Sequence, residues 1–129
     1  MTALRVLMCD DEPAVGAFVR QIAEGLGYEM HFTDQADEFA PLYLSCRPDI
    51  VILDLVMPGT DGIELLHFLA KERSPARILL MSGFDPKIRE VAMLLGEAHS
   101  LDMVGIVAKP VRAAELRERL AALGDDEVV

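Results

Sequence analysis

The stretch Ile50-Val51-Ile52-Leu53-Asp54 decides the fold, because four consecutive apolar residues end abruptly at a carboxylate. A short run rich in Val, Ile and Leu is typical of a strand that is buried on both faces of a parallel sheet. Three other runs share this character: residues 4–9, 77–81 and 104–108. A fifth segment, residues 29–33, alternates apolar and polar residues. That alternation predicts an edge strand with one solvated side.

Helical patterns lie between these strands, because apolar residues recur there every three or four positions. The five stripes are Val15, Phe18, Ile22 and Leu26; Ala36, Phe39, Ala40 and Tyr43; Leu65, Leu66 and Leu69; Ile88, Val91, Ala92 and Leu95; and Ala113, Leu116, Leu120 and Leu123. The chain therefore alternates strand and helix five times. This pattern predicts an α/β domain with an open, doubly wound sheet of parallel strands and helices on both faces.

Residues suited to helix ends support these boundaries: Pro13 and Pro86 for first turns, Gly27 and Gly124 for C-terminal stops, and Asp61 with Glu64 as a capping box. A length of 129 residues, 52% of them hydrophobic, suits one globular domain with one core. We therefore expect a single domain over residues 1–124 and a frayed tail over residues 125–129.

The composition limits the classes of function. No apolar run approaches the length of a bilayer span, and the N-terminus lacks a basic-then-apolar export pattern, so we expect a soluble cytoplasmic protein with no membrane partner. Cys9 and Cys46 are expected to be buried thiols in a reducing compartment rather than a disulfide. A formal net charge of −10 disfavours direct binding to nucleic acid.

Polar residues follow four of the five apolar runs at the point where each strand ends. Asp10-Asp11-Glu12 follow the first run, Asp54 the third, Ser82-Gly83 the fourth and Lys109-Pro110 the fifth. Ligands of open α/β sheets bind beyond the carboxyl ends of the strands. Each residue alone has an ordinary explanation as a cap, a turn or a solvated side chain. Three aspartates, a hydroxyl and a lysine at one edge are harder to explain by chance.

Such a cluster suits a divalent cation and a phosphoryl group. Two carboxylates ~4 Å apart repel each other by roughly 4 kcal/mol at an effective dielectric constant of about 20, so the cluster favours a compensating cation. Mg²⁺ binds one or two carboxylates and completes its shell with waters and phosphoryl oxygens. Asp54 could then be a nucleophile that forms an aspartyl-phosphate. Ser82 and Lys109 would donate hydrogen bonds to phosphoryl oxygens.

These motifs resemble the signature of response-regulator receiver domains of the CheY-like superfamily. The matching residues are Asp10-Asp11, residues 54–59, Ser82-Gly83 and Lys109-Pro110, and the resemblance extends over residues 4–123. It implies a flavodoxin-like (βα)5 fold with strand order 2-1-3-4-5. It also implies Mg²⁺-dependent phosphorylation of Asp54 by a sensor histidine kinase or a histidine phosphotransfer protein, in a signalling domain rather than an enzyme.

The resemblance assigns a role to each residue. It implies that Asp11 and Asp54 ligate Mg²⁺ directly, that Asp10 acts through a metal-bound water, and that the backbone carbonyl of Val56 completes the protein ligands. Lys109 would bridge to Asp54 and then to its phosphoryl group, and the Lys109-Pro110 bond would be cis. Output is expected through the surface of the fourth helix, fifth strand and fifth helix, toward an output domain, a partner protein or a second copy of the chain.

Departures from the family pattern affect the expected output and lifetime. Ile106 stands three positions before Lys109, where receivers commonly carry an aromatic switch residue, and residues 96–103 replace a shorter link before the last strand. Val56 and Phe84 would flank the phosphoryl group by resemblance. Because both are apolar, neither can orient a hydrolytic water, and a long-lived phosphorylated form is expected.

Two other classes of function remain open. An aspartate-based phosphohydrolase also uses an Asp nucleophile and Mg²⁺, but its nucleophile follows the first strand in an Asp-x-Asp pattern that residues 10–13 do not supply. A phosphorylation-independent adaptor would share the fold, although it would be expected to lose a member of the site. His31, His67 and His99 are scattered without metal-ligand spacing and are interpreted as surface or boundary residues.

Overall fold

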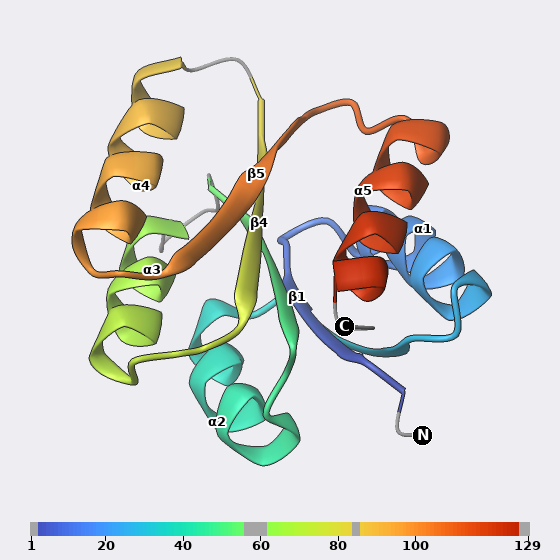
Figure 1. Ribbon diagram of the computed structural model, residues 1–129, viewed down its shortest axis with the longest axis horizontal. Coiled ribbons are helices and arrows are strands. Elements are labelled where there is room, and N and C mark those ends of the chain that lie inside the picture. The colour runs from blue at the N-terminus through green and yellow to red at the C-terminus, as the bar shows by residue number, and fades with distance from the viewer. Residues whose placement is uncertain (1–2, 56–61, 84–85, 127–129) are drawn as a thin grey trace.

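The computed structural model describes residues 3–55, 62–83 and 86–126; residues 125 and 126 are described by their backbone only. Within these residues the chain alternates strand and helix five times, as predicted (Figure 1). The strands are β1 (Arg5–Cys9), β2 (Glu29–Thr33), β3 (Ile50–Asp54), β4 (Arg77–Ser82) and β5 (Asp102–Ala108). The helices are α1 (Pro13–Gly25), α2 (Ala36–Cys46), α3 (Gly62–Lys71), α4 (Pro86–Ala98) and α5 (Ala113–Asp126).

The five strands form one parallel sheet in the order β2-β1-β3-β4-β5, which confirms both the doubly wound fold and the expected strand order. The alternating strand β2 lies at an edge, as its sequence pattern predicts. Helices α1 and α5 cover one face of the sheet, and α2, α3 and α4 cover the other (Figure 1).

Two hydrophobic cores lie on opposite faces of the sheet because successive strand residues point to opposite sides. On β1, Val6 and Met8 belong to the core beneath α1 and α5, whereas Leu7 and Cys9 belong to the core beneath α2, α3 and α4. All four side chains are inaccessible to solvent. This double burial explains why the central strands are apolar throughout rather than alternating.

The predicted helix ends are largely confirmed. Helices α1 and α4 begin at Pro13 and Pro86, and Gly27 adopts a left-handed φ of 85° just beyond the end of α1. The expected stop at Gly124 is wrong, because α5 continues to Asp126. Gly124 instead makes room for Tyr28: a Cβ atom there would lie 2.2 Å from the Tyr28 hydroxyl. The proposed capping box cannot be compared, since Asp61 lies outside the described residues.

The segment before the last strand differs from the short link of the family pattern. Helix α4 ends at Ala98, the chain turns through Ser100 in a left-handed conformation, and β5 begins at Asp102. Pairing between β4 and β5 shifts register beside Ile78, which leaves one additional residue in β5. Ile106 is half-buried on the side of the sheet that faces α4.

The structure also bears on the cysteines and on membrane-spanning helices. Cys9 and Cys46 are both buried and are not joined by a disulfide, as predicted. Within the part of the chain that the structure describes, no helix combines the length and the apolar character that a bilayer crossing requires.

Candidate functional site

The carboxyl ends of four strands bring the predicted site residues to one edge of the sheet. In the pairing of β1 with β3, Cys9 lies opposite Leu53, so the next residues, Asp10 and Asp54, emerge side by side. In the pairing of β4 with β5, Ser82 is opposite Ala108. The backbone N–H of Lys109 then donates a hydrogen bond of 2.8 Å to the Ser82 carbonyl. Strand pairing therefore determines the placement of all four residues.

Lys109 links the two buried carboxylates of the site. Its Nζ atom donates a hydrogen bond of 3.0 Å to Asp54 Oδ2 and lies 3.1 Å from Asp10 Oδ2. The side chains of Asp10 and Asp54 are 0% and 4% exposed, and that of Lys109 is 19% exposed. The bridge from Lys109 to Asp54 that the family resemblance implies is therefore present, and it includes Asp10. The Lys109-Pro110 bond is cis, as expected.

Burial and charge shift the pKa values of these groups in opposing ways. Burial raises the pKa of Asp10, although the backbone N–H of Glu12, 2.9 Å from Asp10 Oδ1, and the contact with Lys109 lower it in part. For Lys109, burial alone would lower the pKa, but the hydrogen bond to Asp54 and the contact with Asp10 outweigh burial and raise it. The lysine is therefore held as a cation between carboxylates.

The acidic end of β1 fits a small divalent cation. Asp10, Asp11 and Glu12 each place a carboxylate oxygen within 4.8 Å of those of the other two. Asp10 Oδ2 is buried and accepts no well-aligned hydrogen bond from the described residues, although it lies close to the Lys109 ammonium. A buried carboxylate oxygen without such a bond is costly. Oxygen ligands of this kind are those that Mg²⁺ prefers.

Glu12 is a member of the site that sequence reasoning assigned no role. Its Oε1 atom lies 3.5 Å from Lys109 Nζ, and its side chain is 60% exposed. The signal was present in the sequence, because Glu12 is the third residue of an uninterrupted acidic run. Its exposure distinguishes it from Asp10, which is completely buried.

Of the predicted positions Ser82, Val56 and Phe84, only Ser82 lies within the described residues. Ser82 ends β4 and is buried, with 1% exposure. Val56, expected to ligate the metal through its carbonyl, and Phe84, expected to shield the site, both lie outside the described residues. Cys9 precedes Asp10, and burial, followed by the charges of neighbouring aspartates, raises the pKa of its thiol to about 12. A neutral buried thiol has little nucleophilic character.

The histidines lie away from this edge. The rings of His67 and His99 have centroids 6.3 Å apart, which their separation in the sequence did not indicate. Both are exposed, one on α3 and the other just after α4, as expected of surface residues. His31 contacts Glu29 at 2.8 Å. None of the three is among the residues that surround Lys109.

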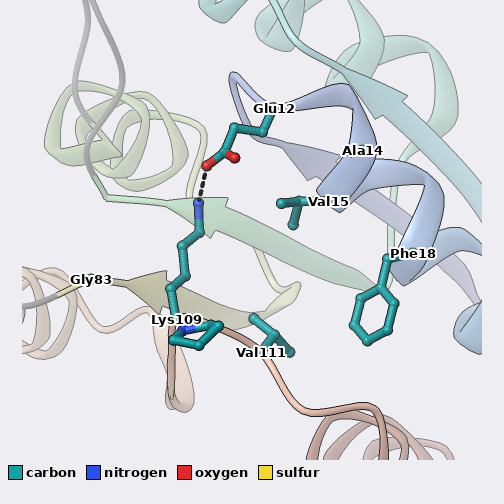
Figure 2. Close-up of a pocket in the computed structure, with 8 residues that line it drawn as sticks. Glu12, Ala14, Val15, Phe18, Gly83, Lys109 and Val111 are labelled. Carbon is teal, nitrogen blue, oxygen red and sulfur yellow. Dashed lines mark ion pairs between the residues drawn. The ribbon is translucent and has the colours of Figure 1, made fainter.

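A cavity of about 450 Å³ adjoins the site on the side of α1 (Figure 2). Lys109 and Glu12 border it and form the ion pair drawn in Figure 2. The rest of the lining is predominantly apolar and comes from the start of α1 and the segment after β5: Ala14, Val15, Phe18, Pro110 and Val111. The cavity thus joins a charged site to an apolar space.

Comparison with known proteins identifies the family. The family model for the response regulator receiver domain matches residues 6–121, and the chain belongs to this family. Over 120 residues it is 33% identical to the positive alginate biosynthesis regulatory protein of Pseudomonas aeruginosa, covering 91% of this chain and 46% of that protein. It is 32% identical over 120 residues to response regulator MprA of Mycolicibacterium vanbaalenii, covering 93% and 50% of the two chains.

Solved structures agree with this assignment. The crystal structure of a response regulator from Colwellia psychrerythraea is similar with a TM-score of 0.81 and 28% identity, and the match covers 97% of this chain and 99% of that one. The chain spans about half the length of the curated relatives it matches. It is therefore a receiver domain of the kind found in two-component response regulators.

Proposed function

We propose that this receiver domain is switched by Mg²⁺-dependent phosphorylation of Asp54, with a sensor histidine kinase or a histidine phosphotransfer protein as the donor. The observation that supports this most is the position of Lys109 Nζ, 3.0 Å from Asp54 Oδ2 and 3.1 Å from Asp10 Oδ2. A lysine held there can neutralise charge on a group attached to Asp54.

Each residue has a separate task in this proposal. Asp54 supplies the carboxylate oxygen that attacks phosphorus, Lys109 contacts a phosphoryl oxygen, and Ser82 donates a hydrogen bond to another. Asp10, Asp11, Asp54 and the carbonyl of Val56 would hold Mg²⁺. The ion would supply positive charge against the negative phosphoryl oxygens. The protein acts in this proposal as an acceptor in signalling rather than as an enzyme that turns over a separate substrate.

Output is proposed to pass through the surface formed by α4, β5 and α5. Val91 and Leu94 are large apolar residues exposed on α4, and Ile106 is half-buried on β5. A charge change at Asp54 can be read as a change in packing at such a surface. The recipient would be an output domain, a partner protein or a second copy of this chain.

The experiment that tests acceptor chemistry uses acetyl phosphate or phosphoramidate with Mg²⁺ and mass spectrometry of the intact chain. We expect the wild type to gain one phosphoryl group and Asp54→Asn to gain none while remaining folded. Asp34→Asn is the matched control, because Asp34 is an exposed carboxylate that follows the edge strand β2. Full modification of the Asp54→Asn protein would disprove the assignment.

The same assay separates the other two classes of function. A phosphorylation-independent adaptor would gain no phosphoryl group from either donor. A phosphohydrolase would release phosphate repeatedly from a phosphate ester. Calorimetric titration with Mg²⁺ adds an independent readout, since Asp11→Asn should weaken binding of the cation by removing a carboxylate ligand. An unchanged affinity would contradict the role proposed for Asp11.

A further inference from the structure

The cavity beside Lys109 has the size and lining of a binding site for a small ligand. Its volume of about 450 Å³ lies within the range of about 300–1,000 Å³ that is typical of ligand pockets. Five of its lining residues are apolar, and Lys109 is the only cation among the lining residues in the described part of the chain. Lys109 is already paired with Glu12 at this end of the cavity, so the pocket itself complements an apolar body that extends from a group bound beside Lys109.

The cavity is also connected to the acceptor residue. Lys109 lines the cavity, and its Nζ donates a hydrogen bond to Asp54 Oδ2. In Figure 2, Lys109 Nζ and Glu12 lie at one end of the cavity, while Phe18 and Val111 lie toward the other. A phosphoryl group near Lys109 could therefore extend its substituent along apolar side chains.

We propose that this cavity binds the leaving group of small-molecule phosphodonors and makes the domain favour acyl phosphates with a ring-sized apolar acyl group. The proposal rests on the proposed function of Asp54 as the acceptor. Benzoyl phosphate is the probe we choose, because its phenyl ring can contact Val15, Phe18 and Val111. Acetyl phosphate carries the same reacting group with a methyl in place of the ring.

The transfer balances without a further reactant. An oxygen of the Asp54 carboxylate forms a bond to phosphorus, and the bond from phosphorus to the acyl oxygen breaks. The electron pair of the broken bond leaves with the acyl oxygen, so the departing group is benzoate. No proton moves. The acceptor Asp54 is a carboxylate before transfer, and the departing benzoate is a carboxylate after it. The pocket holds the leaving group and does not change this chemistry.

The test compares rate constants for phosphorylation by benzoyl phosphate and acetyl phosphate in the wild type and three variants. Ala14→Leu narrows the cavity from an exposed lining position on α1. Ala17→Leu makes the same change at an exposed position of α1 that does not line the cavity. Intrinsic donor reactivity cancels when the ratio of the two rate constants is compared between proteins. A second pocket variant, Val111→Asn, makes the lining polar, and circular dichroism checks that every variant is folded.

We expect the ratio of benzoyl phosphate to acetyl phosphate rates to fall about tenfold in a pocket variant, as for loss of apolar contacts in a binding pocket, and to stay constant in Ala17→Leu. A ratio within twofold of wild type in both pocket variants overturns the proposal, as does an equal fall in Ala17→Leu. Failure of both donors to modify the wild type would instead overturn the proposed function. Modification by acetyl phosphate with unaltered ratios leaves that function standing and removes only the pocket.

Discussion

Replacing Lys109 by Met measures how strongly its ammonium stabilises the edge of the sheet. The change keeps a long side chain but removes the charge that lies 3.0 Å from Asp54 Oδ2 and 3.1 Å from Asp10 Oδ2. Removing one partner of a buried ion pair typically costs about 3–5 kcal/mol, because the other charge remains buried and uncompensated. The contact with Glu12 adds little, since that side chain is 60% exposed and the pair is screened by water.

We therefore expect Lys109→Met to lower the free energy of unfolding by about 3–5 kcal/mol at neutral pH in buffer without divalent cations. Urea denaturation followed by circular dichroism measures it. A slope of about 2 kcal/mol per molar urea converts this loss into a midpoint lowered by roughly 2 M. A domain near the middle of the ordinary range of about 5–15 kcal/mol remains mostly folded after such a loss.

The control is Lys71→Met, which removes an exposed lysine from the last turn of α3. A cation at the end of a helix contributes only about 0.3–1 kcal/mol. Adding Asp54→Asn to Lys109→Met should recover part of the lost stability, because one of the uncompensated carboxylates is gone. The reasoning would be refuted if Lys109→Met cost no more than Lys71→Met, or if the second substitution recovered nothing.

Three further predictions concern packing and reactivity. Gly62→Ala should lower the urea midpoint by the equivalent of about 1–3 kcal/mol, because a Cβ there would lie 2.6 Å from the Asp54 carbonyl oxygen. Gly83→Ala, whose Cβ would meet nothing within 4 Å, is the control, and equal effects would contradict the prediction. Both cysteine thiols are buried and should react with a thiol reagent only after unfolding in urea; rapid reaction in buffer would argue against their burial. Ile106→Ala should cost about 2 kcal/mol, the lower end of the range for such truncations, yet retain phosphorylation-dependent partner binding or self-association; selective loss of that coupling would make Ile106 a switch residue.

The alternation of strands and helices could be predicted from the residues, but the order of the strands could not. The runs that became β1, β3 and β4 are all apolar and short, so their composition does not say which pairs with which. The order 2-1-3-4-5 came from the family resemblance. Gly124 shows a second limit: a glycine near a helix end usually stops the helix, whereas here it admits Tyr28, whose hydroxyl donates to the Leu120 carbonyl from 92 residues away.

The meeting of Asp10, Asp54 and Lys109 at one edge could be predicted, because each stands at the carboxyl end of a strand of one parallel sheet. What the sequence does not contain is the distance between side chains, since Lys109 and Asp54 are 55 residues apart and meet only through the pairing of three strands. The roles expected for Asp10, Asp11, Asp54, Val56, Ser82 and Lys109 stay predictions. The cavity beside Lys109 was not predicted, because its walls come from α1 and from the segment after β5, which lie far apart in the sequence.

The charge balance at this edge links its stability to its function. Asp10 and Asp54 are almost completely buried and share one ammonium, and Asp10 Oδ2 accepts no well-aligned hydrogen bond from the described residues. A sequence selected only for stability would place an apolar residue at the end of β1. A buried carboxylate oxygen that accepts no well-aligned hydrogen bond opposes folding. Local violations of this kind concentrate where binding or chemistry requires them. A cation that approached the carboxylates would offset this opposing free energy, so the feature that weakens the metal-free domain would also favour the Mg²⁺ binding proposed above.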